Sequence, residues 1–165
     1  MSKELTTTKP KHALGTVFGD QEQFVTVMIG GQMFGIPVLK VHDVLQQQRI
    51  THVPLAPPEV AGSLNLRGRI VTAINMRCRM GMEVIEQTGN KAMSAVVECQ
   101  NELYSLIVDS VGEVLTLPIT DYERNPPTLP AAWRDLSAGI YRLKDELLVV
   151  LDIERLLNVN KTAAA

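Results

Sequence analysis

Short apolar segments recur at about ten-residue spacing along the chain, and turn-forming residues separate them. Two such segments flank a Gly-Gly pair at residues 30–31, and two more flank Lys144-Asp145. Paired segments of this kind are typical of β-hairpins. The spacing therefore predicts an all-β barrel or sandwich. Because both halves of the chain show the same hairpin-rich pattern, two small barrels packed side by side fit the sequence, with an apolar groove at their seam.

The composition of the chain restricts its core and its partners. A chain of 165 residues is long enough for one ordinary domain with a sizeable core. Hydrophobic residues make up 45% of it and aromatic residues only 4%, so we expect an aliphatic core. The net charge of -2 argues against a nucleic-acid partner, which would need a basic surface. Cys78 and Cys99 lack a CxxC spacing, which fits reduced thiols better than a disulfide or zinc site.

Both ends of the chain are expected to be flexible tails. Residues 1–21 are polar and interrupted by Pro10, and residues 159–165 are small and polar, so residues 22–158 form the predicted domain. No apolar run approaches the roughly 20 residues that a membrane span needs. The first residues also lack the apolar segment of a signal peptide. These observations predict a cytoplasmic protein without direct membrane insertion.

The connections between the strands carry weaker signals. Three prolines make Thr51–Glu59 a rigid loop. Residues 38–45 suit a short helical or irregular stretch that leads to a strand near residues 46–50. The remaining predictions are helical turns at Pro58–Ala61, Asn75–Gly81 and Asp152–Leu157, and an irregular segment at Asp121–Leu136.

The segment Gly62–Val71 predicts a tight turn at the mouth of a β-layer. Glycines at positions 62 and 68 allow backbone angles that other residues resist, and Arg67 directly precedes the second of them. The turn would present one fixed guanidinium, whose five donors suit a carboxylate. Asp43 is the nearest candidate counter-charge. Taken alone, the pattern is more typical of a surface arginine that adds little stability.

No arrangement of residues in the sequence supports an enzyme. His42 and His52 are ten positions apart and have no third ligand at a metal-like spacing. Cys78 lies between Arg77 and Arg79, which could lower the pKa of its thiol, but no partner for nucleophilic catalysis is recognisable. A phosphate-binding glycine loop is also missing. We therefore expect no catalytic residue, no cofactor and no metal.

A binding function explains the apolar residues better. More valines are present than one face of a small β-layer needs: Val38, Val41, Val44, Val111 and Val114. Most of them are expected in the core, and a minority could line a groove for a partner helix. A partly buried pair of Asp43 and Arg67 would fix the shape of that groove rather than add much stability.

Several recognisable motifs occur in order from about Gln23 to Leu157. The most specific is the run from Val60 to Val71, with its Gly-x-x-Asn-Leu-Arg-Gly core. The others are Phe34–Val38, Val41–Val44, Val53-Pro54 with Ala56-Pro57, Ile107–Leu115 and Leu148–Leu157. Together, these motifs resemble the CheW family of bacterial chemotaxis coupling proteins.

This resemblance implies an all-β fold of two SH3-like, five-stranded β-barrels around a shared hydrophobic core, with short helices at the connections and C-terminus. It also implies a non-catalytic scaffold in membrane-bound chemoreceptor arrays that binds the regulatory domain of the histidine kinase CheA. The cytoplasmic tip of the chemoreceptors would lie in the groove between the barrels, and other copies of the chain would join it in array rings. The positions that match the family's receptor or kinase contacts are Val41, Asp43, Gly62, Asn65, Arg67 and Val114.

Departures from the family pattern leave the choice of partner open. Asn75 stands where the family usually has Asp, Asp43 is shorter than the more frequent Glu, and a methionine-rich run follows residue 75. The alternatives within the family are a specialised member in a non-flagellar pathway and an array component with altered receptor binding. Two other classes are a thiol enzyme using Cys78 and a free-standing SH3-like binder of proline-rich peptides. The peptide binder would need an aromatic-lined groove, which this aromatic-poor chain does not favour.

Overall fold

The computed structural model describes residues 17–18, 20–46, 49–84 and 93–157. The strands of this part of the chain are β1 (Val17–Phe18), β2 (Gln21–Ile29), β3 (Gln32–Pro37), β4 (Val41–Gln46), β5 (Val60–Leu66), β6 (Arg69–Asn75), β7 (Met93–Cys99), β8 (Glu102–Val108), β9 (Ser110–Pro118), β10 (Tyr122–Glu123), β11 (Ser137–Arg142) and β12 (Leu147–Leu151). The helices are η1 (Val38–Lys40), α1 (Met76–Arg79), η2 (Ile119–Asp121), α2 (Ala131–Arg134) and α3 (Ile153–Leu157). The tail predicted for residues 159–165 and most of that predicted for residues 1–21 lie outside the described residues, although β1 falls within the latter segment.

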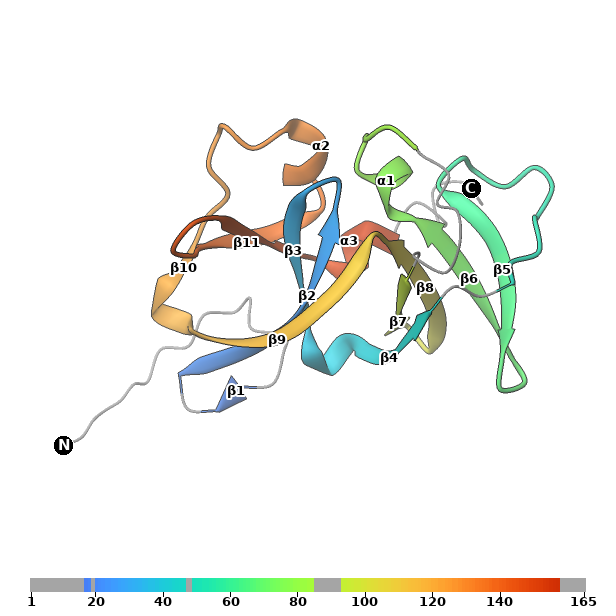
Figure 1. Ribbon diagram of the computed structural model, residues 1–165, viewed down its shortest axis with the longest axis horizontal. Coiled ribbons are helices and arrows are strands. Elements are labelled where there is room, and N and C mark those ends of the chain that lie inside the picture. The colour runs from blue at the N-terminus through green and yellow to red at the C-terminus, as the bar shows by residue number, and fades with distance from the viewer. Residues whose placement is uncertain (1–16, 19, 47–48, 85–92, 158–165) are drawn as a thin grey trace.

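The strands form two sheets, each rolled into a barrel (Figure 1). The first barrel has the strand order β1-β2-β3-β12-β11-β10, and β9 pairs with β2 as well. The second barrel has the order β4-β7-β8-β6-β5. In the described part of the chain, the second barrel has the expected five strands, whereas the first has seven, because β1 adds a short edge and η2 separates β9 from β10.

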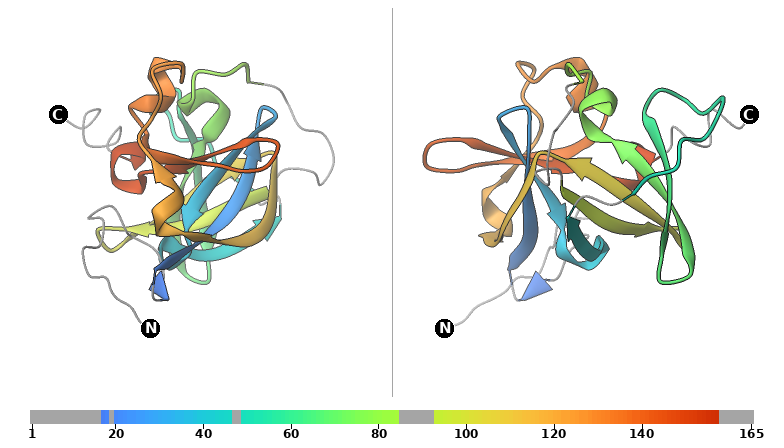
Figure 2. Two further views of the ribbon diagram at one scale, coloured as in Figure 1. Left: turned by 90° about the vertical axis from the view of Figure 1, so that its left-hand side faces the viewer. Right: turned by 45° about the vertical axis from the view of Figure 1, so that its right-hand side comes forward.

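The two barrels do not correspond to the two halves of the chain. The second barrel is one continuous segment, from β4 to β8, whereas the first takes strands from both sides of that segment. Strand β3 runs parallel to β12, with Met33 opposite Leu148, and this pairing joins the beginning of the domain to its end. Figure 2 shows the early blue strands and the late orange and red ones gathered in the same barrel. The second barrel is thus an insertion into the first.

Both barrels use the same order of strand partners. In the first, the β2–β3 hairpin pairs in parallel with β12, which continues antiparallel to β11 and β10. In the second, the β5–β6 hairpin pairs in parallel with β8, which continues antiparallel to β7 and β4. The hairpin pattern of the sequence therefore reflects two similarly built barrels, although each barrel is not one half of the chain.

The largest apolar cluster lies between the barrels and is called here the shared core. It draws on both sheets and on α3, and its members include Val27, Ile29, Phe34, Ile36, Ile74, Val97, Leu106, Val149 and Leu156. Each barrel also has a smaller core of its own, around Phe24 and Tyr141 in the first and around Leu64 and Val71 in the second. Burial of apolar surface is the main force for folding, so the shared core holds the two barrels together.

Two predictions about the connections are wrong. Residues 41–46 already form β4 after the single 3-10 turn η1, so the strand expected near residues 46–50 begins earlier. The exposure of β4 alternates with the period of a strand because it pairs with β7, with Val41 opposite Val97. Residues 58–59 form a turn rather than a helix: the N–H of Val60 donates to the carbonyl of Pro57 at 2.9 Å, and Val60 begins β5.

The two other predicted short helices are confirmed. Asn75 caps α1, because its Oδ1 accepts a hydrogen bond from the N–H of Cys78 at 3.2 Å. Gly81 follows this helix with a φ of +75°, as a terminating glycine does.

The segment Asp121–Leu136, predicted to be irregular, contains β10 and α2, and Trp133 of α2 packs edgewise on Phe34 of the shared core. No helix in the described ranges is both long and apolar enough to cross a bilayer.

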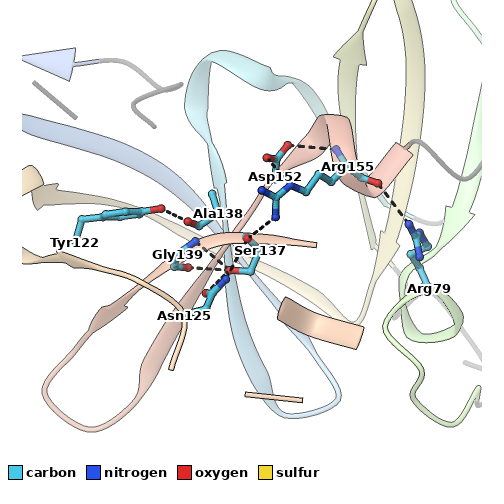
Figure 3. Close-up of polar contacts among 8 residues, drawn as sticks. All are labelled: Arg79, Tyr122, Asn125, Ser137, Ala138, Gly139, Asp152 and Arg155. Carbon is cyan, nitrogen blue, oxygen red and sulfur yellow. Dashed lines mark hydrogen bonds and ion pairs between the residues drawn. The ribbon is translucent and has the colours of Figure 1, made fainter. Parts of the chain in front are cut away.

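The C-terminal helix α3 is fastened by polar contacts to both barrels (Figure 3). Asp152 caps it as expected, since its Oδ1 accepts a hydrogen bond from the N–H of Arg155 at 3.2 Å. Arg155 reaches the carbonyl of Ser137 in the first barrel at 3.4 Å. Arg79 of α1 donates to the carbonyl of Leu156 at 3.0 Å, near the negative end of the helix. The helix therefore joins the two barrels through backbone carbonyls as well as through the shared core.

A second contact between the barrels centres on Arg77 of α1. Its Nε and Nη2 donate to the two carboxylate oxygens of Asp109 at 2.9 and 2.6 Å. Asp109 also accepts a hydrogen bond from the N–H of Gly30, in the turn between β2 and β3, at 2.9 Å. The side chains of Arg77 and Asp109 are only 18% and 23% exposed, and the hydrogen bond with Asp109 raises the pKa of Arg77. Bidentate geometry makes this a strong pair that links the second barrel to the first.

Candidate protein-binding site

The turn between β5 and β6 is a two-residue hairpin loop with Arg67 at its first position. Arg67 has a φ of +52° and Gly68 a φ of +86°, which is the pattern of a type I′ turn. The side chain of Asn65 stabilises the turn, since its Oδ1 accepts a hydrogen bond from the N–H of Gly68 at 3.0 Å. Arginine is unusual at a position that favours Asn, Asp or Gly. The turn thus holds an arginine in one fixed backbone conformation at the surface.

Arg67 pairs with Asp43 of β4, as the sequence predicted. The distance from Arg67 Nη2 to Asp43 Oδ2 is 3.1 Å. The side chain of Arg67 is 78% exposed and that of Asp43 is 29% exposed. The ion pair therefore joins the tip of the β5–β6 hairpin to the edge strand β4, and most of the guanidinium remains available to a partner.

Gly62 of β5 is buried and allows the backbone at residue 51 to approach this hairpin closely. The N–H of Ser63 donates to the carbonyl of Thr51 at 2.8 Å, which lays residue 51 against β5. A Cβ at position 62 would lie 2.2 Å from the Thr51 oxygen, and the φ of +152° is one that other residues rarely adopt. Among the predicted site residues, Asp43, Asn65 and Arg67 are brought together at the surface, whereas Gly62 shapes the hairpin.

The valines lie on either side of the seam between the barrels, and the prediction that most of them are core is wrong. Val41 of β4 and Val111 of β9 are partly buried and pack against the shared core. Val44 of β4 and Val114 of β9 are exposed, at 38% and 50%. Val38, in η1, is half-buried. The edges of β4 and β9 therefore expose apolar side chains beside the seam, with the Asp43–Arg67 pair on the second barrel and Val114 on the first.

A feature that the sequence did not indicate is a β-bulge beside each group of predicted site residues. One bulge lies between Val41 and Asp43 in β4, and another between Val60 and Gly62 in β5. A third lies in β9, just before Val114. Bulges bend a strand and re-aim its side chains, and they are frequent beside functional sites. The sequence carried no signal for them, because a bulge depends on the register between two strands.

The structure does not support an activated thiol at position 78. Burial raises the pKa of the Cys78 thiol, and the nearby carboxylate of Glu59 raises it further. The flanking arginines, which were expected to be able to lower this pKa, are engaged elsewhere: Arg77 binds Asp109 and Arg79 binds the end of α3. The thiol therefore loses its proton less readily than an ordinary cysteine does.

Together, these features describe a protein-binding module: two barrels locked through a shared core, with an ordered, largely exposed arginine and apolar strand edges at their seam. A family model described as the CheW-like domain matches residues 23–161. The chain belongs to the CheW family.

Individual relatives agree with this assignment. The chain is 25% identical over 142 residues to the chemotaxis protein CheW of Treponema pallidum, covering 84% of each chain. It is 28% identical over 135 residues to the chemotaxis protein CheW of Helicobacter pylori, covering 82% of this chain and 81% of that protein. Its fold is similar to the crystal structure of the scaffolding protein TtCheW from Thermoanaerobacter tengcongensis, with a TM-score of 0.76, 26% identity, and coverage of 84% of this chain and 94% of that one.

These comparisons confirm the family and the fold of two SH3-like barrels. They also place the chain among the scaffold proteins of chemotaxis. Asn75 stands where the family usually has Asp, and its side-chain oxygen still caps the N-terminus of α1.

Proposed function

We propose that this chain couples chemoreceptors to the histidine kinase CheA. It binds the regulatory domain of the kinase and the cytoplasmic tip of the receptors, and it holds both in a fixed geometry without catalysing a reaction itself. It works on the cytoplasmic side of membrane-bound receptor arrays, where further copies of the chain join it. Membership of the CheW family supports this proposal.

The observation that carries the proposal is the exposed Asp43–Arg67 ion pair on its strained turn. An exposed pair of this kind adds at most about 1 kcal/mol to folding stability, and Arg67 lies 78% exposed. A positive φ costs a residue other than glycine about 1–2 kcal/mol, so the turn gains little for the fold from its arginine. Strained residues cluster at functional sites, and this arginine is pre-ordered for a carboxylate or carbonyl group of a partner.

The apolar edges beside the seam support a helical partner. Val44 and Val114 are exposed on β4 and β9, and Val41 and Val111 lie deeper, against the shared core. An amphipathic helix can lay its apolar face against exposed apolar side chains of this kind. The receptor tip, a helical hairpin, is the partner that we assign to this surface.

The test is a titration of the full chain against the kinase regulatory domain and, separately, against a receptor tip hairpin. We expect Arg67→Ala to weaken binding of the receptor tip by about tenfold, as loss of a central arginine in an interface does, while the free energy of unfolding falls by less than about 1 kcal/mol. Arg142→Ala is the matched control, because Arg142 forms an exposed ion pair with Glu123 in the first barrel, with a distance of 2.9 Å between Nε and Oε1.

Saturable binding to both partners, weakened by Arg67→Ala and not by Arg142→Ala, would support the coupling role. Equal affinity of the Arg67→Ala variant and the wild type would remove Arg67 from the site. Binding to the kinase domain alone would indicate an array component with altered receptor binding, and binding to neither would refute the proposal.

A further inference from the structure

The bulge in β9 places two residues opposite one. In the register of β9 with β2, Gly112 and Glu113 together lie opposite the single residue Thr26. Regular antiparallel pairing resumes on both sides of this point. Such an extra residue bends the strand and changes which face the following side chains occupy.

This bulge determines the direction of Val114. Val111 and Val114 are three positions apart, so in a regular strand they would point to opposite faces. Their partners on β2 are Val27 and Val25, which are two positions apart and therefore share a face. Val111 packs against the shared core, and Val114 lies on the same face of β9 and is 50% exposed. The bulge thus turns Val114 toward the seam.

Thr26 fits the bulge through its hydroxyl group. Its side chain is buried, at 4% exposed, and Oγ1 donates a hydrogen bond to the carbonyl of Glu113 at 2.7 Å. Gly112 leaves space for this hydroxyl, because a Cβ at that position would lie 2.6 Å from Thr26 Oγ1. The buried hydroxyl of Thr26 and the missing side chain of Gly112 therefore both help to maintain the bulge in β9.

We propose that Thr26 is a positioning residue of the candidate protein-binding site: its buried hydroxyl holds the β9 bulge that aims Val114 at the receptor tip. Thr26 does not touch the partner itself and acts through the backbone of Glu113. This proposal rests on the proposed function, because it takes the receptor tip as the partner of Val114.

The test compares Thr26→Val, which keeps the shape of the side chain and removes the donor, with Thr26→Ser, which keeps the donor. Loss of the hydrogen bond from the buried Thr26 hydroxyl predicts a receptor tip affinity about fivefold weaker for Thr26→Val and within about twofold of wild type for Thr26→Ser. Thr116→Val is the matched control, because Thr116 Oγ1 accepts a hydrogen bond from Gln23 Nε2 across the same two strands, at 3.3 Å, outside the bulge. Circular dichroism checks that each variant is folded.

Amide hydrogen exchange of the free protein gives a readout that needs no partner. We expect the amides of Glu113 and Val114 to exchange faster in Thr26→Val and at the wild-type rate in Thr26→Ser and Thr116→Val. Unchanged exchange in Thr26→Val would show that the hydroxyl does not hold the bulge, and faster exchange with full affinity would show that the bulge does not aim Val114. If the wild type binds neither partner, the proposed function fails, and exchange still decides whether Thr26 holds the bulge.

Discussion

Gly62 illustrates how one residue can support a binding surface without reaching it. It is buried under the Thr51 carbonyl, and its φ of +152° allows the approach of the chain at residues 50–51 to β5. The neighbouring turn carries Arg67 and is closed by a second glycine, Gly68. The two glycines differ in what surrounds them, because a Cβ at position 68 would meet nothing within 4 Å.

This difference predicts unequal effects for two otherwise similar substitutions. We expect Gly68→Ala to lower the free energy of unfolding by about 1 kcal/mol, through backbone strain alone. Gly62→Ala should lower it by about 3 kcal/mol, because a backbone oxygen would have to move away in addition. Urea unfolding of the two variants measures both values. Equal losses would show that the Thr51 carbonyl moves away at little cost.

The turn that presents Arg67 was predictable from sequence because it is local. The Arg-Gly sequence and the preceding asparagine are adjacent in the chain, and they specify a hairpin turn without reference to the rest of the fold. The contribution of Thr26 was not predictable. It depends on a hydrogen bond between residues 87 positions apart, and a bulge has no periodic signal in the sequence. The depth of Val38, Val41, Val44, Val111 and Val114 was likewise set by the seam, which only the packing of the barrels defines.

At the scale of elements, the helix α1 makes several contacts between the barrels although it has only one turn. Arg77 binds Asp109, Arg79 binds the carbonyls at the end of α3, and the carbonyl of Met80 accepts a hydrogen bond from Trp133 Nε1 at 3.0 Å. These three contacts come from separate segments, and each one ends on the helix or its C-terminal cap. The helix therefore fixes the orientation of the second barrel relative to the first.

The largely buried pair at Arg77 should matter more for stability than any exposed ion pair. We expect Arg77→Ala to lower the free energy of unfolding by about 3 kcal/mol, because it leaves the carboxylate of Asp109 without its main counter-charge. Arg142→Ala should lower it by less than about 1 kcal/mol, since both partners of that pair are exposed. Thermal and urea unfolding measure both variants. A small loss for Arg77→Ala would mean that the shared core alone orients the barrels.

Elements with local signals were predicted well, and those defined by pairing were not. Asn75 before α1, Gly81 after it and Asp152 before α3 are end signals that the structure confirms. Residues 38–45 carry apolar positions that suit a helix in isolation, but pairing with β7 makes most of them a strand. The helix α2 was missed because the prolines around it are typical of a loop.

At the scale of the whole molecule, the shared core predicts that the two barrels unfold as one cooperative unit. The shared core takes strands from both sheets, and each barrel has only a smaller core of its own. Separation of the barrels would expose the larger apolar cluster to water. Neither barrel is therefore expected to unfold alone.

This arrangement predicts a single unfolding transition. Trp133 packs on Phe34 of the shared core and donates to the carbonyl of Met80, so its fluorescence reports on the contact between the barrels, whereas far-ultraviolet circular dichroism reports on the strands of both. Urea titrations followed by the two signals should coincide within error, as two-state unfolding requires. A tryptophan transition that clearly precedes the circular dichroism transition would show that the barrels separate before their strands unfold, and so are independent domains.

The insertion of the second barrel into the first also has a consequence for synthesis on the ribosome. Strands β2 and β3 are translated first, but β9 and β12, with which they pair, are translated only after the whole second barrel. All strands of the second barrel have been translated at that stage, but its side of the shared core still lacks the strands of the first barrel that cover it. In the nascent chain, β2 and β3 therefore lack these partner strands, and the shared core stays partly exposed until α3 has left the exit tunnel. The order in which the strands are made differs from the order in which they can assemble.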